Sequence, residues 1–304
     1  MLEKLLRLLG YEKIQGQAEE QPEIETSEPT IDEHIATIAS YHNANFNKIE
    51  QAISNTHFDL KQLIASGGST ESEETLLRLN TLMLGIWCES RLHKLVYERD
   101  LFSESERKSI YSANSLEDKW KKSLEVALRR SKGLNADTPL DIDSLGFQLF
   151  QVYSQVKNWI DIHFSPIIKL RNKVAHSQWV NPFKNYQSGW DSSWDFKLCG
   201  ETKGLLNKEN VLTLEYKHEL LKRIATAINN LSLTNTEYGV QDFDSMYDSI
   251  SETAGKLTVL KNRDVMQFKS RLVERYNYQQ EQRKTAQENT IINKLKLQFD
   301  LVPK

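Results

Sequence analysis

Residues 31–65 read IDEHIATIASYHNANFNKIEQAISNTHFDLKQLIA, a stretch without glycine or proline. Its apolar residues recur at helical spacing, which predicts one long α-helix with a seam that packs against another helix. One seven-residue row holds Ala39, Phe46, Ile53 and Leu60, and its neighbour holds Ile35, His42, Ile49, Thr56 and Leu63. The polar His42 and Thr56 in this seam are more typical of register-setting contacts than of chemistry. The run Ser-Gly-Gly-Ser-Thr at 66–70 ends the helix.

The chain beyond this helix has the same character. Residues 71–102 are apolar nearly all round between Leu76 and Cys88, which predicts a central core helix. Ser103 with Glu106 has the pattern of a capping box. Helices are further expected over residues 115–130, 141–160 with Asp141 or Asp143 as cap, 165–181, 208–231 and 243–298. Ser165 followed by Pro166 predicts a sharp helix start, with Ser165 as the N-cap.

No stretch alternates between strand and helix patterns, and glycine and proline together are only 18 of 304 residues. The fold class that follows is all-α. Residues 183–207 are irregular and are expected to hold a hairpin or an extended insertion. Three parts are expected: a flexible acidic tail with a short leading helix at 1–30, a helical domain at 31–235 and a C-terminal helical extension at 236–304.

Composition narrows the class of protein. The net charge of −3 argues against a generally basic nucleic-acid-coating protein, and two distant cysteines, Cys88 and Cys199, exclude a disulfide framework. No apolar run approaches the roughly 18 residues of a membrane span. The charged opening MLEKLLRLLG does not resemble a secretory signal. We therefore expect a soluble, cytoplasmic protein without a membrane partner.

Most catalytic signatures are absent, including glycine-rich phosphate loops, nucleophile elbows and zinc spacings, so we expect no metal ion or other cofactor. Asp141-x-Asp143 is better explained as a helix cap than as a metal site. What remains is Arg-Asn-Lys-Val-Ala-His at 171–176, in the helix that begins at Ser165. Arg171 is always charged and its planar fork suits phosphate oxygens, whereas His176 can transfer a proton near neutral pH.

The spacing of these two residues sets a geometric condition. Five positions on an ideal helix separate Arg171 and His176 by about 140°, whereas Asn172 and His176 share a face. A functional site would have to use the helix end or a second copy of the helix, which favours a twofold dimer. The alternative from the residues alone is structural: Arg171 pairs with a nearby acid and His176 caps the helix C-terminus.

The segment 171–176 resembles the signature of the HEPN superfamily, the helical-bundle domains of many RNA-cleaving toxins and antiviral effectors. The resemblance covers the helices from 71 to 160, the motif helix and the helix from 208 to 231. It implies an HEPN-like bundle in which Arg171 and His176 are the catalytic pair and Asn172 is the polar residue that follows the arginine. It also implies a metal-independent ribonuclease that works as a dimer. Gln178 stands where relatives that act with a nucleotidyltransferase carry tyrosine, so their activity is not expected.

Other residues are predicted to support this site. Lys173 and Trp179 are candidate substrate-binding residues, although Trp179 and Phe183 are also typical anchors of a helix end. Glu89, Arg91 and His93 on the core helix either line the same cleft or form a structural ion network. Two basic segments suit an RNA backbone or a solvated helix face: residues 119–132, with net charge +5, and residues 256–296, with net charge +6.

The sequence thus leads to a homodimeric endoribonuclease that cleaves single-stranded RNA or tRNA and leaves a 2′,3′-cyclic phosphate, as a toxin or antiphage effector, with a regulatory protein as a possible partner. The alternative is a non-catalytic helical module that scaffolds, or that senses a nucleotide or a partner protein. The two differ in what they expect of Arg171→Ala and His176→Ala, which only the first requires to be inactive.

Overall fold

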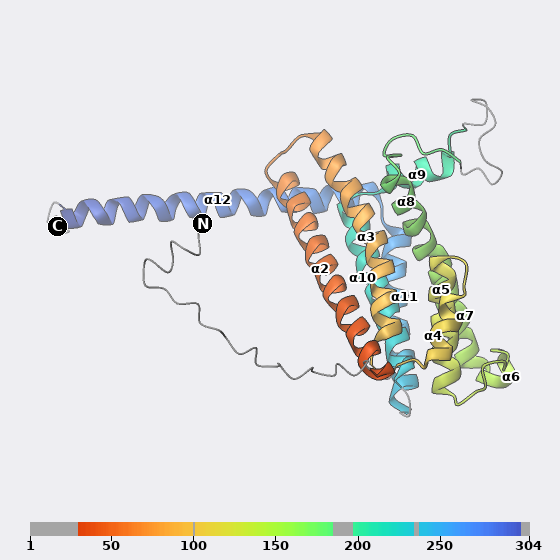
Figure 1. Ribbon diagram of the computed structural model, residues 1–304. Helices are drawn as coiled ribbons and strands as arrows, with labels where there is room; N and C mark the ends of the chain where they lie inside the picture. The colour runs from red at the N-terminus through yellow and green to blue at the C-terminus, as the bar shows by residue number, and fades with distance from the viewer. Residues whose placement is uncertain (1–29, 100, 185–196, 234–236, 299–304) are drawn as a thin grey trace, which may run out of the picture. The chain divides into compact units, whose positions relative to one another are not determined.

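The computed structural model describes residues 30–99, 101–184, 197–233 and 237–298 (Figure 1). The chain divides into two units, residues 1–34 and 35–304, and the features below belong to the second. The predicted tail at 1–30 lies outside the described residues except for Thr30. Within the described part the structure is all-α, without a β-strand, and none of its helices is long and apolar enough to cross a membrane.

The long N-terminal helix is present as α2 (Ile31–Ala65), and its predicted seam is confirmed. Phe46, Ile53 and Leu60 of the first row are buried. Thr56, in the neighbouring row, accepts a hydrogen bond through its carbonyl from the Asn80 amide at 3.2 Å. Asn80 lies on α3 (Thr70–Tyr97) and also donates to the Leu76 carbonyl, so this polar contact fixes how α2 sits on α3.

Two core helices begin at the serines that the sequence predicts, Ser103 and Ser115, and a third begins at a cap that was not predicted, Ser69. Ser69 caps α3, Ser103 and Glu106 form the capping box of α4 (Glu104–Tyr111), and Ser115 caps α5 (Leu116–Ser131). One core joins α3, α5 and α10 (Val211–Ser232), and its largest fully buried side chains include Trp87 and Trp120. Trp120 donates its indole N–H to the Cys88 carbonyl at 3.1 Å, so the deepest indole is hydrogen-bonded.

The Asp141 cap is present, but on a shorter helix than predicted. Asp141 and Ser144 close a capping box on α6 (Ile142–Leu145). Gly146 then takes a φ of 76°, a left-handed conformation that glycine adopts without strain, and separates α6 from α7 (Phe147–Trp159). Asp141 therefore caps one turn and does not begin the 13-residue helix α7.

The helix start at Ser165 was predicted wrongly. The chain stays helical from α7 through a π-helical turn, η1 (Ile160–Phe164), into α8 (Ser165–Ala175). The Ser165 N–H bonds to the Ile160 carbonyl, and no side chain caps α8. Ile160 and Phe164 are fully buried, so core packing holds the turn helical, and the wider π turn accommodates Pro166, which has no N–H to donate.

Backbone pairing joins two described parts of the region after the motif helix. Phe183 and Leu198 form an isolated antiparallel bridge, and residues 185–196 between them lie outside the described residues. The end of the stretch predicted as irregular is helical, as α9 (Gly200–Lys208). The bridge thus brings α9 back beside the end of α8, where Leu206 packs with Leu170 and Val174.

The C-terminal part consists of α11 (Glu237–Val259) and α12 (Asn262–Gln298). Ile250 and Ala254 of α11 are buried in the same core as α10, so this part of the predicted extension packs within the bundle. Phe268 and Leu272 of α12 pack against that core, whereas the described side chains from 279 onward are exposed.

Candidate functional site

The motif helix α8 lies against α3. It buries Ile167, Leu170 and Val174, which fall on one face, and leaves Asn172 and Ala175 exposed. Arg171 lies at the edge between these two faces and is 31% exposed. The helix therefore presents Arg171 and Asn172 towards solvent, while Ile167, Leu170 and Val174 fix it to the core.

Gly85 of α3 makes the close approach of these helices possible. A Cβ at this position would lie 2.1 Å from Cβ of Arg171 and 2.5 Å from its Cγ, distances that real Cβ atoms do not show. Glycine is therefore required for the stem of Arg171 to lie directly on α3. The sequence around Gly85 does not predict this role, because a single glycine inside a helix has many explanations.

The Arg171 guanidinium has two partners. It donates to the amide oxygen of Asn172 at 2.9 Å, and it forms an ion pair with the carboxylate of Glu89, one turn beyond Gly85 on α3. Glu89 is 42% exposed, so this pair lies at the surface. This ion pair is the pairing with a nearby acid that the structural interpretation of Arg171 predicts.

His176 ends the helix. It is the C-cap residue, with φ −94° and ψ 30°, and its side chain is exposed. Ser177 follows in the left-handed conformation, with φ 62°. Its N–H bonds to the Val174 carbonyl at 3.1 Å, and the Gln178 N–H bonds to the Lys173 carbonyl at 2.9 Å. These two bonds form a Schellman motif, which holds the His176 backbone at a helix end that favours a cation.

The structure joins Arg171 to Asn172 through their side chains and Asn172 to His176 through the helix backbone, where the His176 N–H donates to the Asn172 carbonyl at 3.2 Å. The described contacts of the Arg171 guanidinium run to Asn172 and Glu89, so Arg171 and His176 are neighbours on the end of α8 that do not bond each other. Such an arrangement can bind an anion at Arg171 and offers an exposed imidazole one turn away.

The two predicted substrate-binding residues are built into the fold. Lys173 is buried, with its ammonium group donating to the Phe183 carbonyl. Trp179 donates its indole N–H to the Val174 carbonyl at 2.9 Å, and its own carbonyl accepts from Nε of Arg78 at 3.1 Å. Both side chains anchor the segment that follows the motif. For Trp179, this is the role of helix-end anchor that the sequence analysis gave as the alternative to substrate binding.

Arg78 is a residue that sequence reasoning missed. It is buried on α3, and besides Trp179 it bonds the Leu206 carbonyl at 2.8 Å and the Glu74 carboxylate at 3.1 Å. Gln178 has a similar role, because its side-chain oxygen accepts the Phe183 N–H at 2.8 Å. An arginine inside an apolar helix was the available signal, since a buried charge requires partners.

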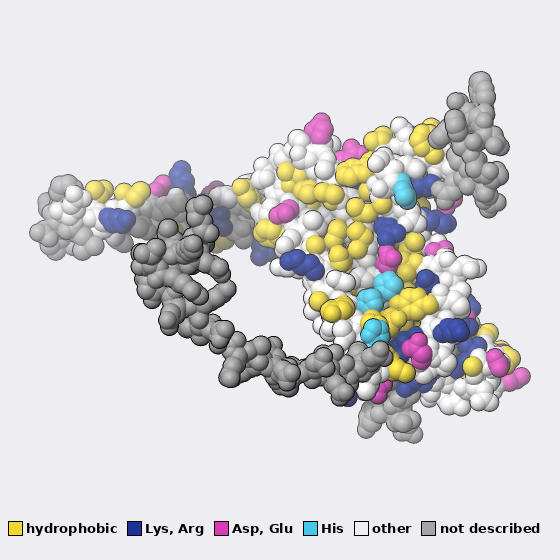
Figure 2. All heavy atoms as spheres, viewed as in Figure 1, with side chains coloured by type: hydrophobic (Ala, Val, Ile, Leu, Met, Phe, Trp, Pro, Cys, Tyr) yellow, Lys and Arg dark blue, Asp and Glu magenta, His cyan; other side chains and the backbone are white. Residues whose placement is uncertain are grey.

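The other polar residues of α3 form a structural network. Arg91 donates to Asn229 of α10 at 3.2 Å and lies over the Phe46 ring. His93 stacks on His42 with ring centres 5.1 Å apart, and its Nδ1 lies 2.6 Å from the Tyr111 hydroxyl. Burial lowers the pKa of both histidines, which favours their neutral form. Histidine side chains gather on the face seen in Figure 2, with acidic and basic side chains beside them.

The basic segment 119–132 is largely neutralised by neighbouring acids. Lys121 pairs with Asp161 at 2.5 Å, and Arg130 pairs with Glu106 at 3.1 Å. Lys122 and Arg129 share the Glu125 carboxylate at 3.7 and 3.8 Å. This pattern is that of a solvated, ion-paired helix face, and it gives little support to a phosphate-binding track.

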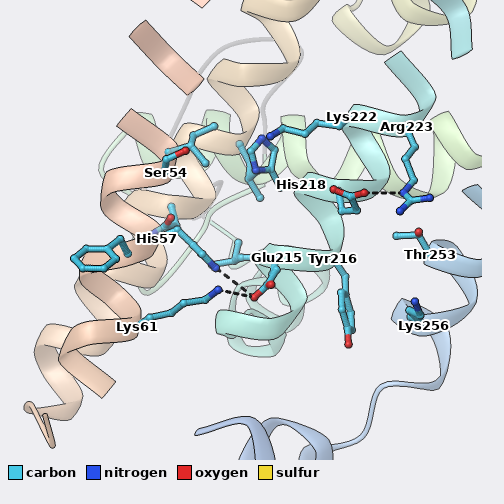
Figure 3. Close-up of a pocket in the computed structure, with 16 residues that line it drawn as sticks. Ser54, His57, Lys61, Glu215, Tyr216, His218, Lys222, Arg223, Thr253 and Lys256 are labelled. Carbon is cyan, nitrogen blue, oxygen red and sulfur yellow. Dashed lines mark hydrogen bonds and ion pairs between the residues drawn. The ribbon is translucent and has the colours of Figure 1, made fainter. Parts of the chain in front are cut away.

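A second group of polar side chains lines a cavity of about 600 Å³ between α2, α3, α10 and α11, away from the motif (Figure 3). His57 and Lys61 extend from α2, and Glu215, His218 and Lys222 from α10. In the described part of the chain, no cluster of three or more histidine, cysteine or acidic side chains is suited to a metal ion.

The chain matches no protein-family model, no curated protein and no solved structure in the comparisons made.

Proposed function

We propose that the protein is a metal-independent endoribonuclease of the HEPN type that acts as a homodimer. The observation that carries the proposal is the end of α8. There Arg171, Asn172 and an exposed His176 occupy consecutive turns on a helix fixed to the core. The site combines a permanent cation, which can stabilise charge on a phosphate, with an imidazole that can transfer a proton, so it can support RNA cleavage without a metal.

The reaction would begin with the ribose 2′-OH beside the scissile phosphate. A base removes the hydroxyl proton, the O2′–P bond forms, and the P–O5′ bond breaks as an acid protonates the leaving 5′-oxygen. Arg171 would stabilise the charge that builds on the phosphate oxygens. His176 would be the base or the acid. A single imidazole cannot hold both states at once, so His176 of a second copy would supply the other role.

Glu89 would set the position of the arginine. Its ion pair with Arg171 holds the guanidinium against α3 in the absence of RNA. Pairs at such exposed positions are worth only about 0–1 kcal/mol, so a phosphate can displace the carboxylate at little cost. Asn172 would then remain as the neighbour that orients the guanidinium through its side-chain oxygen.

The test is cleavage of total RNA by the purified protein in excess EDTA, compared among variants. We expect Arg171→Ala and His176→Ala each to lower the rate by at least about 100-fold, the usual range for an acid–base or charge-stabilising group. Arg263→Ala and His34→Ala remove the same side-chain types from exposed positions on α12 and α2, and they should cleave at the wild-type rate. Cleavage that survives in both motif variants would discard this site.

Three contacts favour a second candidate function. Because Arg171 already has Glu89 as a partner and Lys173 and Trp179 anchor the chain, the motif also fits a non-catalytic helical module. If the protein is such a module, Glu89→Gln should lower the free energy of unfolding and have no other effect. The ribonuclease predicts instead that Glu89→Gln, which frees the guanidinium, changes the KM for RNA while His176→Ala changes kcat.

A further inference from the structure

The exposed face of α8 carries a lysine that lies outside the motif. Lys169 stands seven positions before His176, so the two side chains project about 20° apart on an ideal helix, with Asn172 beside them. All three residues are exposed, whereas Ile168 and Leu170 on either side of the lysine are buried. Lys169 therefore shares the solvent face of the motif's amide and imidazole.

The positive charge of this helix is not balanced within it. The 11 residues of α8 include Lys169, Arg171 and Lys173 and no acidic residue. Arg171 is paired with Glu89, and the buried Lys173 donates to the Phe183 carbonyl. Among the residues that the structure describes, Lys169 has neither a carboxylate nor another hydrogen-bonding group as partner of its ammonium. Its charge is therefore available to an anion.

A second exposed lysine lies at the same edge of α8. Lys173 lies one turn after Lys169 and donates to the Phe183 carbonyl. Lys184 is the next residue along the chain, and its N–H donates to the Lys197 carbonyl at 2.9 Å, which fixes its backbone beside the helix. The Lys184 side chain is exposed and, within the described part of the chain, also lacks a partner. Two available cations thus stand at one edge of the motif's exposed face.

The setting of these two lysines suits phosphates beside the cleaved one. An ammonium group binds phosphate oxygens as a compact point charge, and here it would not have to leave a carboxylate, as Lys121 and Arg130 of the segment 119–132 would. At about 1.5 Å per residue, Lys169 lies about 10 Å from His176 along the helix axis. A phosphate in contact with Lys169 is therefore a different one from the phosphate at His176.

From this arrangement we infer that Lys169 and Lys184 are substrate-positioning residues that bind RNA phosphates next to the one that is cleaved. The inference rests on the proposed ribonuclease function and adds a requirement on the substrate. The RNA must extend beyond the cleaved bond on the side of these lysines, so a dinucleotide, which has one phosphate, is a poor substrate. Contacts of this kind fix the position of the strand and carry no sequence information.

The experiment compares cleavage of a dinucleotide and of a hexanucleotide by the full chain and by Lys169→Met/Lys184→Met. We expect the wild type to have a kcat/KM at least about tenfold higher for the hexanucleotide, because only this substrate reaches the lysines. In the double variant the KM for the hexanucleotide should rise at least about fivefold with little change in kcat, and cleavage of the dinucleotide should change less than about twofold. The matched control Lys48→Met/Lys108→Met, which removes two exposed lysines from α2 and α4, should behave as the wild type.

RNA binding measured without cleavage, in the His176→Ala background, separates this inference from the ribonuclease proposal. Each lost phosphate contact should reduce the slope of log Kd against log salt concentration by about 0.7, or by about 1.4 for the two lysines. Because neither lysine has a partner in the described fold, the double variant should keep the wild-type melting curve.

Two results would overturn the inference and spare the ribonuclease: an unchanged salt slope in the double variant, or an equal loss in the control variant. A wild type that cleaves neither oligonucleotide would contradict the ribonuclease instead, and the salt slope would still decide whether the lysines bind RNA. Polyglutamate that competes for the lysines as well as RNA of equal charge would assign this edge to an acidic protein and overturn its assignment to RNA.

Discussion

Gly85 is the residue on which the geometry of the motif depends most. A methyl group there would overlap the stem of Arg171, at 2.1 Å from its Cβ. We expect Gly85→Ala to lower the free energy of unfolding by about 1–3 kcal/mol, the usual cost of overpacking, and to displace Arg171 from Glu89. Urea denaturation measures the first effect. Gly204→Ala is the control, because a Cβ at Gly204 meets nothing within 4 Å, and it should be neutral or stabilising.

Ser177 is the second residue with a defined conformational cost. Its φ of 62° is a conformation that glycine adopts more easily than serine. We expect Ser177→Gly to raise the free energy of unfolding by about 0.5–1 kcal/mol, and Ser251→Gly, at an exposed position inside α11, to lower it by a similar amount. If thermal melting shows both variants destabilised equally, the Schellman end of α8 is not as described.

The sequence predicts these local features unevenly. Caps such as Ser103 and Ser115 depend on neighbouring residues, and they appear where the pattern places them. Ser165 has an equally good cap pattern, yet it lies inside a continuous helix because Ile160 and Phe164 are buried beside it. A tertiary cause of this kind leaves no local signal.

At the scale of the helices, α2 and α10 exchange ionic contacts that predict how stability depends on pH. Glu215 of α10 contacts His57 and Lys61 of α2, and Glu50 of α2 contacts His218 and Lys222 of α10. The contact with His57 and, to a smaller extent, the contact with Lys61 lower the pKa of Glu215 to about 2. The pKa of Glu50 is also about 2. Both pKa values lie below the ordinary 4.5, so folding favours the ionised forms. Their stabilisation is therefore present above about pH 4.5 and is lost as the pH falls towards 2.

We expect Glu50→Gln to reduce this acid sensitivity. For a partly exposed carboxylate the contribution is about 1–2 kcal/mol after allowance for solvent screening. The measurement is the free energy of unfolding in urea between pH 7 and pH 3. Glu281→Gln, at an exposed position on α12, should keep the wild-type slope. An unchanged slope in Glu50→Gln would show that the contacts between α2 and α10 do not hold that carboxylate ionised.

The helix pattern alone could not show what α2 and α10 build together. His57 and Thr56 fall on or beside the predicted seam, but their partners, Glu215 and Asn80, lie on other helices. The sequence predicts that such residues need partners without saying which ones. The same limit applies to Lys173, whose burial follows from the return of the chain at Phe183.

At the scale of the whole molecule, α12 divides into a packed part and an exposed part. Phe268 and Leu272 contact the core, and Lys269 pairs with Glu73 of α3 at 2.5 Å, whereas the described side chains from 279 onward are exposed. We expect deletion of 279–304 to leave the melting temperature within about 2 °C of wild type, because every side chain described in that segment is exposed. Deletion of 262–304 should lower it by several degrees. Equal losses would mean that the exposed half contributes to folding.

The all-helical class was accessible from periodicity, because apolar rows at helical spacing run through most of the chain. The motif residues Arg171, Asn172 and His176 could be identified from the sequence because they lie within six consecutive positions. Glu89 could be identified as a polar residue of the core helix, but the sequence did not show that its partner is Arg171. Gly85 and Arg78 were not identified, because each acts through a contact between α3 and the distant region around α8 and α9.

The most direct measurement for the central claim is the chemistry of the RNA ends left by the protein in excess EDTA. We expect 5′-hydroxyl and 2′,3′-cyclic phosphate ends from the wild type and none above background from His176→Ala. We also expect that a substrate with a single 2′-deoxynucleotide at the cleaved position resists cutting there, because the attacking hydroxyl is absent. Products that carry 5′-phosphates, or cleavage of the deoxy-substituted position at an equal rate, would contradict the central claim.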